Sequence, residues 1–358
     1  MILIDARMVG ALPHGIARYA EGLVPALHAE APDEEFVALV APGLPPASPI
    51  ARGPLAATSI PLYGAREQVL LPGLVRRLGP RLLHSLTYAL PLAVGIPAIP
   101  TIHDLIHLHY PTRLGALQSL YYAAVVGPAA RRAPVVITVS AATREAIAER
   151  FRIPRERIVV TPLAADPRFL AADDAAAEAA RRRHALPAEF LLFVGNPRPH
   201  KNAAGALRIR DLLARDHGID VPLLLVGIAP ADAGRAASAR CLPSFPDADL
   251  PGLLRAARAI LLPSLDEGFG LPALEGMAAG SPVVAARRGG LPEVVGDAAL
   301  LEDPGDEPAF AAALARVLRD GALADELRAR GRARAARFTW RETARRTLEA
   351  YRVALGGS

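Results

Sequence analysis

The sequence predicts an α/β protein with two Rossmann-like parallel-sheet domains that face each other across a cleft. Short apolar runs alternate with stretches of helical spacing from end to end, which is typical of parallel sheets covered by helices. A length of 358 residues suffices for two domains, each with its own core. Ligand sites in such sheets lie at the carboxyl ends of the strands, so we expect the site in the cleft.

The first predicted domain covers residues 1–167. Its apolar runs predict strands at 2–4, 36–40, 98–102, 135–139 and 158–160, and one more that ends at His84. Helical spacing predicts helices that begin at Gly15, cover 68–78 and cover 141–151, the last with Ser140 as its N-cap. Residues 41–62 are rich in proline and glycine, which indicates loops.

A linker and a second domain follow. Between residues 168 and 188, alanine, aspartate and arginine occur at helical spacing with little periodic core, and we assign this segment to the linker. The second domain, 189–339, has apolar runs at 190–194, 222–226, 259–262, 282–286 and 298–301. The tail from residue 307 to 355 is almost continuous helix, interrupted at Phe338-Thr-Trp340.

Composition limits the compartment and the partners. A hydrophobic share of 52% with 22% charged residues indicates a globular chain. The apolar stretch 88–102 is shorter than the roughly 18 residues of a membrane span and is broken by prolines and a glycine. The start lacks the basic region of a signal peptide, and a single cysteine, Cys241, fits a reducing compartment, so we expect a cytoplasmic protein. The net charge of +5 favours anionic partners, whereas 5% aromatic residues and no basic run interleaved with aromatics argue against nucleic acid.

One basic helix face would suit a membrane. The predicted helix 68–78 carries Arg76 and Arg77, with Arg81 just beyond it, beside apolar leucines such as Leu70. This pattern suits peripheral contact with an anionic surface at the inner face of the plasma membrane. A solvated helix face is the alternative.

The segment around which the second domain is organised is Pro263-Ser-Leu-Asp-Glu-Gly-Phe-Gly-Leu-Pro-Ala-Leu-Glu275, which joins a predicted strand to a helix. Gly268 and Gly270 permit positive φ and let a ligand approach the backbone, and the free amides of the helix N-terminus suit a phosphate. Glu267 and Glu275 add carboxylates that suit hydroxyl groups. A nucleotide sugar offers both kinds of group.

Two other interpretations of this segment stay open. A glycine-rich turn is often a structural loop without a ligand. Gly268-x-Gly270-x-x-Ala273 also fits the dinucleotide fingerprint, and Arg287 and Arg288 after the next strand would suit the 2′-phosphate of NADP. That fingerprint is expected at the first strand of a domain, which weakens the NADP hypothesis.

A basic loop follows the first strand of the second domain. Arg198 and Lys201 stand just before a helix that begins at Asn202. Two cations and a helix N-terminus suit a diphosphate, whereas a solvated basic loop is the alternative.

Two candidates come from the first domain. His103 ends the strand 98–102, where it is well placed to hydrogen-bond a substrate. His107 and His109 follow, but one cysteine in the chain and no histidine pair in the spacing of a zinc-binding helix argue against a metal site. Gly15 opens the first helix, where it could approach a donor phosphate or the acceptor.

Several motifs coincide in order, and together they resemble the retaining GT-B glycosyltransferases of the group 1 (family four) type over nearly the whole chain. The motifs are Asp5-Ala-Arg7 with Gly15-Ile-Ala-Arg-Tyr19, Thr101-Ile-His-Asp-Leu-Ile106, Ile137-Thr-Val-Ser140, Val194-Gly-Asn-Pro-Arg-Pro-His-Lys-Asn202, Pro263 to Pro272 with Glu275, and Phe338-Thr-Trp340. The resemblance implies that the tail from about residue 340 to 358 crosses back onto the first domain.

The resemblance also implies roles for the candidate residues. Glu267 would hold hydroxyls of the donor sugar and Glu275 those of the ribose, while Arg198 and Lys201 would neutralise the leaving diphosphate. His103 would contact the donor sugar. Donor-binding backbone would come from Gly15, Gly268, Phe269, Gly270 and Leu271. Many relatives place the arginine directly after the glycine, where this chain has Asn196, so Lys201 is the firmer assignment of the two cations.

The implied activity is metal-independent transfer of a hexose with retention of configuration. The expected donor is GDP-mannose and the expected acceptor a saccharide or lipid-linked saccharide in surface polysaccharide biosynthesis, with no further cofactor. A UDP-, ADP- or dTDP-sugar, as for a glucosyl or rhamnosyl donor, stays open. So do a non-catalytic nucleotide-sugar-binding partner and an NADP oxidoreductase.

Overall fold

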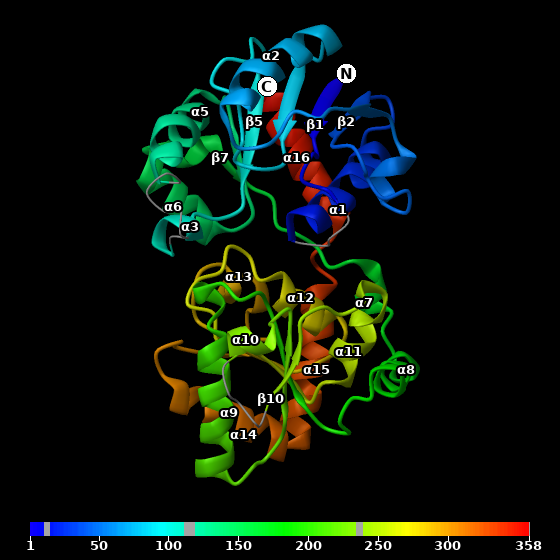
Figure 1. Ribbon diagram of the computed structural model, residues 1–358, viewed down its shortest axis with the longest axis vertical. Coiled ribbons are helices and arrows are strands. Elements are labelled where there is room, and N and C mark those ends of the chain that lie inside the picture. Colours follow the sequence, from blue (N-terminus) through cyan, green and yellow to red (C-terminus); the bar gives the residue numbers. More distant parts are fainter. Residues whose placement is uncertain (11–14, 111–118, 234–238, 358) are drawn as a thin grey trace. The chain divides into compact units, whose positions relative to one another are not determined.

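The computed structural model describes residues 1–10, 15–110, 119–233 and 239–357 (Figure 1). The chain forms two compact units, Met1–Leu163 together with Thr339–Ser358, and Ala164–Phe338. Each unit contains one parallel sheet covered by helices, which confirms the predicted α/β class. No helix in the described ranges has both the length and the apolar character needed to cross a membrane.

The first unit is built on a seven-stranded sheet with the order β3-β2-β1-β4-β5-β6-β7. Its strands, all parallel, are β1 (Ile2–Asp5), β2 (Phe36–Val40), β3 (Leu55–Ala57), β4 (Leu82–Ser85), β5 (Ala98–Ile102), β6 (Val136–Thr138) and β7 (Ile158–Val160). Its helices and turns are α1 (Gly15–Glu30), η1 (Pro49–Arg52), α2 (Ala65–Leu78), α3 (Ile106–His109), η2 (Tyr122–Val126), α5 (Gly127–Arg132), α6 (Ala141–Phe151), η3 (Arg155–Arg157) and α16 (Trp340–Ala354). Strand β1 is buried along its whole length, because helices cover both faces of a parallel sheet.

A buried polar cluster joins the C-terminal helix α16 to this sheet. His84 on β4 is fully buried, with Nδ1 2.6 Å from the Tyr351 hydroxyl and Nε2 2.8 Å from the Thr101 hydroxyl. At the other end of α16, Trp340 lies so close to α1 that a Cβ on Gly22 would fall 2.1 Å from its ring. Residues more than 250 positions apart in sequence thus share one core.

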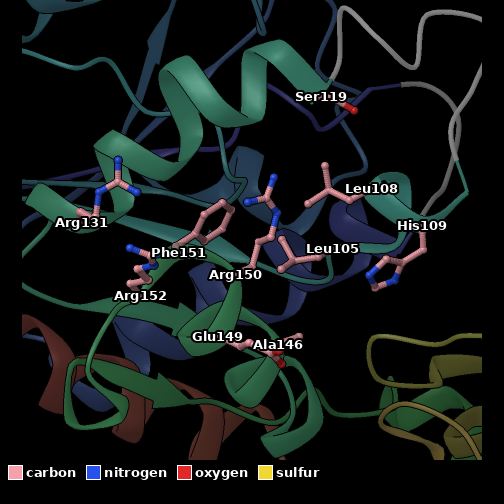
Figure 2. A pocket seen from close by; sticks show the side chains of 10 residues that line it. All are labelled: Leu105, Leu108, His109, Ser119, Arg131, Ala146, Glu149, Arg150, Phe151 and Arg152. Atoms are coloured by element: carbon pink, nitrogen blue, oxygen red, sulfur yellow. The ribbon is translucent and has the colours of Figure 1, made fainter.

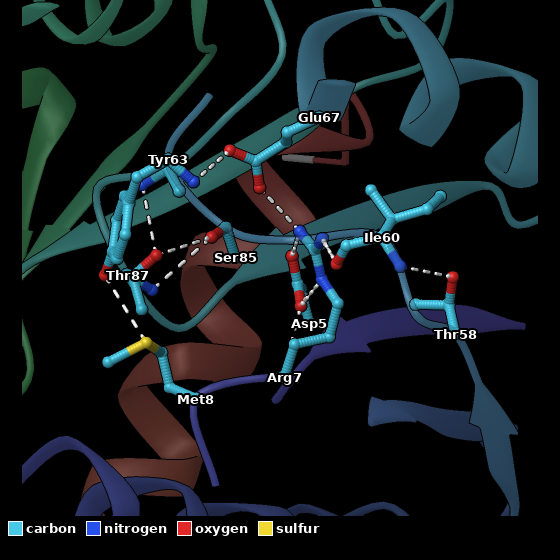
Figure 3. A network of polar contacts seen from close by, with 10 residues as sticks. Asp5, Arg7, Met8, Thr58, Ile60, Tyr63, Glu67, Ser85 and Thr87 are labelled. Atoms are coloured by element: carbon cyan, nitrogen blue, oxygen red, sulfur yellow. Dashed lines mark hydrogen bonds and ion pairs between the residues drawn. The ribbon is translucent and has the colours of Figure 1, made fainter. Parts of the chain in front are cut away.

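A second buried cluster supports the loops at the carboxyl ends of β1 and β4 (Figure 3). The Arg7 guanidinium donates to Asp5 at 2.6 and 2.8 Å and to Glu67 Oε1 at 2.6 Å. Glu67 Oε2 accepts the Tyr63 amide at 2.9 Å, and Tyr63 has a positive φ of 61°. Burial raises the pKa of Glu67, which the Arg7 charge opposes. The buried carboxylate therefore fixes a backbone conformation that a tyrosine rarely adopts.

The second unit contains a six-stranded parallel sheet with the order β10-β9-β8-β11-β12-β13. Its strands are β8 (Leu191–Val194), β9 (Leu223–Val226), β10 (Ala239–Leu242), β11 (Ala259–Leu262), β12 (Val283–Ala286) and β13 (Leu300–Glu302). Its helices and turns are α7 (Pro167–Leu170), α8 (Asp174–His184), η4 (Pro199–Lys201), α9 (Ala203–His217), α10 (Pro230–Ala233), η5 (Asp247–Asp249), α11 (Leu250–Ala256), α12 (Leu271–Ala278), α13 (Leu291–Val295), α14 (Glu307–Arg319) and α15 (Gly321–Ala335). The strand order reverses between β8 and β11, which makes this pair of strands the topological switch point of the sheet.

Three local expectations need correction. Residues 168–188 are not a linker but form α7 and α8 of the second unit, where a Cβ on Gly252 of α11 would lie 2.4 Å from the Ala176 carbonyl oxygen of α8. Small side chains allow this close helix packing, which a search for large apolar residues overlooks. The segment 41–62, which we expected to consist of loops, contains η1 and strand β3. Strand β10 was also not predicted from the sequence. Both strands lie at sheet edges, and β3 is largely exposed, so neither shows a continuous apolar run.

We expect the buried His84 to make folding sensitive to mild acid. Burial, helped by the nearby His103, lowers the pKa of His84 to about 3, whereas the unfolded chain takes up this proton near pH 6.5. Stability from this group is therefore full above pH 6.5 and falls as the pH drops from 6.5 toward 3. Between pH 7 and pH 5 the wild type should lose about 2 kcal/mol more of its free energy of unfolding than His84→Gln does. Urea denaturation at both pH values measures this, and parallel losses would contradict it.

Candidate functional site

The loops after β8 and β11 are tied together at the switch point of the second unit. The Leu265 amide donates to the His200 carbonyl at 2.7 Å. Asn202 caps α9 with its side-chain oxygen, 3.1 Å from the Gly205 amide, and donates its side-chain amide to the Pro263 carbonyl at 3.0 Å. Asn202 has φ 56°, a left-handed conformation that asparagine tolerates better than most residues. Asn202 therefore sets the start of α9 relative to the end of β11.

This arrangement brings Lys201 and Glu267 together. Lys201 Nζ lies 2.6 Å from Glu267 Oε2, and both side chains are 14% exposed. A charge-assisted hydrogen bond of this length, largely shielded from water, is stronger than an exposed ion pair. Lys201 is also the only lysine in the sequence. Apart from histidines, every other basic side chain is an arginine. The two residues that the sequence placed at one anion site are thus in direct contact.

The glycine turn leads directly into α12. Gly270 has φ 104° and its carbonyl accepts the Ala273 and Leu274 amides at 3.0 and 3.1 Å, which starts the helix. Gly268 is buried and Leu271, the first residue of α12, is half-buried. The Phe269 ring is 5% exposed and packs edge-on against Phe338 at 5.9 Å, so its side chain serves packing.

The segment Arg287–Gly290 after β12 supports this turn. The Gly290 amide donates to the Glu267 carbonyl at 2.8 Å. Gly289 has φ 54°, and a Cβ there would lie 2.1 Å from the Glu267 carbonyl oxygen. Two consecutive glycines shortly after β12, the strand that pairs with β11, indicate such close contact between backbones.

The other two predicted donor residues of this unit differ in exposure. Arg198 is exposed, its amide donates to Asn196 Oδ1 at 3.1 Å, and it makes no ion pair with any residue that the structure describes. Glu275 is 2% exposed on α12. Arg198 is thus free to turn toward an anion, whereas Glu275 occupies a fixed, enclosed position.

The remaining candidates belong to the first unit. His103 follows β5, with Nε2 3.0 Å from the Leu86 carbonyl oxygen and its ring edge-on to Tyr19 at 4.9 Å. Gly15 is the first residue of α1. Both lie on loops or helices that follow strands of this unit's sheet.

The geometry bears on metal and NADP binding. Within residues 1–10, 15–110, 119–233 and 239–357, no three His, Cys, Asp or Glu side chains are grouped so that they could hold a metal ion. Arg288 pairs with Asp303 at 3.1 Å, and Arg287 donates to the Leu301 carbonyl at 2.7 Å. Both arginines are thus engaged with β13 and the loop after it, and the glycine turn follows β11, not the first strand of the unit. NADP binding is therefore disfavoured.

Comparison with known proteins gives consistent matches. The family model for glycosyl transferases group 1 matches residues 176–334, and that for glycosyltransferase family 4 matches residues 13–169. O-antigen chain mannosyltransferase B of Escherichia coli is 33% identical over 267 residues, which cover 72% of this chain and 70% of that enzyme. D-inositol 3-phosphate glycosyltransferase of Salinispora arenicola is 40% identical over 194 residues, 48% of this chain and 43% of that protein. The solved structure of WaaG, a glycosyltransferase involved in lipopolysaccharide biosynthesis, superposes with a TM-score of 0.77 at 14% identity and covers 98% of this chain and 99% of that one, which shows the same fold.

We expect Gly289→Ala to disturb the turn that holds Glu267. The new methyl group meets the Glu267 carbonyl at 2.1 Å and the backbone keeps a positive φ, so the substitution should cost more than about 1 kcal/mol of unfolding free energy. Gly321→Ala is the matched control, because nothing lies within 4 Å of its Cβ, and it should change stability by less than about 0.5 kcal/mol. Chemical denaturation measures both, and equal stabilities would show that the contact at Gly289 is not tight.

Proposed function

Because this chain belongs to the group 1 glycosyltransferases, we propose that it transfers a hexose from a nucleotide sugar to a saccharide or lipid-linked saccharide with retention at the anomeric carbon. The single observation that carries the proposal is the Lys201–Glu267 ion pair at the switch point, beside the glycine turn and the N-terminus of α12. It brings a cation, which suits a phosphate, and a carboxylate, which suits sugar hydroxyls, to the same place.

The charges suit the bond that breaks. When the bond between the anomeric carbon and the phosphate oxygen breaks, negative charge develops on the leaving diphosphate. Lys201, the exposed Arg198 and the amides of Gly270 and Leu271 would stabilise that charge more in the transition state than in the ground state. Glu267 would accept hydrogen bonds from sugar hydroxyls. A phosphate competes with Glu267 for Lys201, so donor binding itself would release the carboxylate for the sugar.

Transfer with retention is proposed to occur on one face of the sugar. The acceptor hydroxyl oxygen bonds to the anomeric carbon from the side on which the diphosphate leaves, and the departing phosphate oxygen takes the hydroxyl proton. Atoms and charges then balance without a protein nucleophile and without a metal. Trapping a covalent glycosyl-enzyme would contradict this path. In the same scheme His103 would contact the donor sugar, Glu275 the ribose and Gly15 the donor phosphates.

The donor and the setting are proposed from the relatives. The similarity to an O-antigen chain mannosyltransferase supports mannose as the transferred sugar and a role in surface polysaccharide biosynthesis, and we propose GDP-mannose as the donor. UDP-, ADP- and dTDP-sugars are the alternatives. We propose that the enzyme acts in the cytoplasm, because we expect its substrates there. The outer face of α2 would suit peripheral membrane contact, since Val69 is 73% and Leu70 49% exposed on the helix that carries Arg76 and Arg77.

Removing either member of the ion pair should abolish transfer. We expect Glu267→Ala and Lys201→Ala each to lower the turnover number by about 100-fold or more, because each removes a charge that would face the reacting groups in the proposed mechanism. Lys201→Arg should restore little activity, since a planar guanidinium does not replace a compact ammonium in an enclosed site. Arg208→Ala breaks an exposed ion pair with Glu307 on the same unit and should leave turnover unchanged. Release of nucleoside diphosphate measures turnover and circular dichroism checks folding; full turnover of Lys201→Ala would remove that residue from the mechanism.

The donor nucleotide sugar should be identifiable because its binding stabilises the folded protein. GDP-mannose at 100 times its dissociation constant should add about 2.7 kcal/mol to the unfolding free energy and raise the melting temperature of the wild type more than UDP-, ADP- or dTDP-sugars do. Stabilisation by NADPH alone would favour the oxidoreductase alternative. Stabilisation by a sugar nucleotide without turnover on any saccharide acceptor would favour the non-catalytic partner.

A further inference from the structure

The imidazole of His103 contacts a backbone carbonyl through one of its nitrogens. Its Nε2 lies 3.0 Å from the carbonyl oxygen of Leu86, the residue that follows β4. A carbonyl oxygen only accepts hydrogen bonds, so Nε2 carries the proton in this arrangement. A single hydrogen bond to one ring nitrogen still lets an imidazole pivot, because the last torsion of a histidine side chain is broad. A second contact is needed to fix the plane of the ring.

Tyr19 on α1 supplies such a contact. The Tyr19 and His103 ring centroids lie 4.9 Å apart at an interplanar angle of 83°, which is the edge-to-face arrangement that aromatic rings prefer. Tyr19 is fully buried, whereas His103 is half-buried. The Tyr19 hydroxyl also lies 3.4 Å from the hydroxyl of Thr101 on β5. Tyr19 therefore contacts both the imidazole and the strand that leads to it.

Trp340, at the start of the C-terminal helix α16, packs against Tyr19 in turn. The two ring centroids lie 6.4 Å apart. Gly22 stands three residues after Tyr19 and thus on the same face of α1. A Cβ on Gly22 would fall 2.1 Å from the Trp340 ring, so this glycine makes room for the indole. Tyr19 is thus in contact with His103 and with Trp340.

A hydrogen-bonded chain anchors Thr101 to the same helix. The Tyr351 hydroxyl lies 2.6 Å from His84 Nδ1, and His84 Nε2 lies 2.8 Å from the Thr101 hydroxyl. Burial lowers the pKa of His84 to about 3, so this imidazole is neutral at pH 7 and has one donor and one acceptor nitrogen. Helix α16 therefore supports the surroundings of Tyr19 at two points, through Trp340 and through Tyr351.

The segment after His103 provides weaker support. Leu105, Leu108 and His109 belong to the lining of a cavity of about 1060 Å³ (Figure 2). A hollow supplies fewer packing atoms than a filled core, so the chain that borders it is less restricted. The plane of the His103 ring therefore depends mainly on the contact with Tyr19.

These contacts also give a role to the motif Phe338-Thr-Trp340. Phe338 packs edge-on against Phe269 within the second unit, at 5.9 Å between ring centroids, whereas Trp340 packs within the first unit. Between them Thr339 caps α16, since its side-chain oxygen accepts the Glu342 amide at 3.2 Å. The motif thus determines where α16 begins, and with it the place of Trp340.

We propose that Tyr19 is a positioning residue for His103 and that Trp340 holds Tyr19 in place. Tyr19 keeps the imidazole in the plane in which Nε2 faces the Leu86 carbonyl, so that His103 meets the donor sugar in one orientation. The contact between His103 and that sugar is part of the proposed function, on which this inference rests. Tyr19 and Trp340 act only through His103, and a displacement of about 1 Å can cost about 100-fold in rate.

A spectroscopic test observes His103 directly and needs no nucleotide sugar. In the full chain labelled with ¹⁵N at histidine, the Nε2 proton of His103 should give a signal that exchanges slowly with water. The variant His103→Gln identifies this signal by its loss. The signal should persist in Tyr19→Phe, which keeps the ring, and disappear in Tyr19→Leu and Trp340→Leu, because a mobile imidazole exchanges its proton with water.

Phe36→Leu is the matched control. Phe36 is a fully buried aromatic residue of the same unit, and it begins β2 beside Ile2, the first residue of β1. His103 follows the carboxyl end of β5, so the two residues lie at opposite ends of a parallel sheet. The His103 signal should persist in this variant. Trp340 is the only tryptophan in the sequence, so its fluorescence shows in each Tyr19 variant whether α16 remains packed.

Turnover provides a second test. Tyr19→Leu and Trp340→Leu should each lower the turnover number by roughly 10- to 100-fold, whereas Tyr19→Phe and Phe36→Leu should stay within about twofold of the wild type. In a His103→Ala background, Tyr19→Leu should change turnover by less than about twofold, because a residue that acts through His103 has no further effect without it. Trp340→Leu keeps the inference testable if Tyr19→Leu does not fold.

Three results would overturn the inference. One is a wild type without a slowly exchanging His103 signal. Another is an unchanged signal in folded Tyr19→Leu and Trp340→Leu, or an equal loss in Phe36→Leu, which would indicate general loosening of the unit. The third is a loss of turnover from Tyr19→Leu that is as large without His103 as with it. Failure of the proposed function looks different: the signal would respond as expected, yet the wild type would transfer no sugar from any nucleotide sugar.

Discussion

The Lys201–Glu267 ion pair is the interaction on which the second unit's site depends. Its two side chains come from loops that follow β8 and β11, the strands between which the sheet order reverses. Charges in a largely enclosed position are tolerated only when they are paired, so the loops must hold them within hydrogen-bond distance. Asn202, which caps α9 and reaches the end of β11, supplies that constraint, and Gly289 lets the next loop pack against the Glu267 backbone. The contacts between these loops therefore determine whether Lys201 and Glu267 can pair.

The first unit relies on buried polar groups in a comparable way. Arg7 balances Asp5 and Glu67, and His84 bonds both to the sheet and to Tyr351 of the C-terminal helix. These groups lie below the loops that present His103 and the strained Tyr63. The last helix of the chain is thus part of the support for His103, a proposed site residue in the first half of the chain.

Much of this was predictable from sequence, for identifiable reasons. Strand-to-loop-to-helix segments with charged residues are visible locally, which is why Lys201 and Glu267 could be named and expected at one site. The residues in other loops that support this pair could not be named from the sequence. Their contacts depend on which strands are neighbours in the sheet, such as β8 and β11, and local sequence patterns do not show this. The role of Asn202 follows from that adjacency, and the role of Gly289 follows from the adjacency of β11 and β12. The prediction of a linker at residues 168–188 was wrong for another reason. Helix α8 packs through alanines, which are too small to produce a clear apolar pattern in the sequence.

The single lysine has a practical consequence. Reagents that acylate or reductively alkylate amines find one lysine side chain in this sequence, Lys201. Because Lys201 is paired with Glu267 and largely buried, any molecule that displaces the carboxylate would alter how fast that one amine reacts. Peptide mass mapping of the modified protein would then follow occupancy of the proposed site at one defined atom.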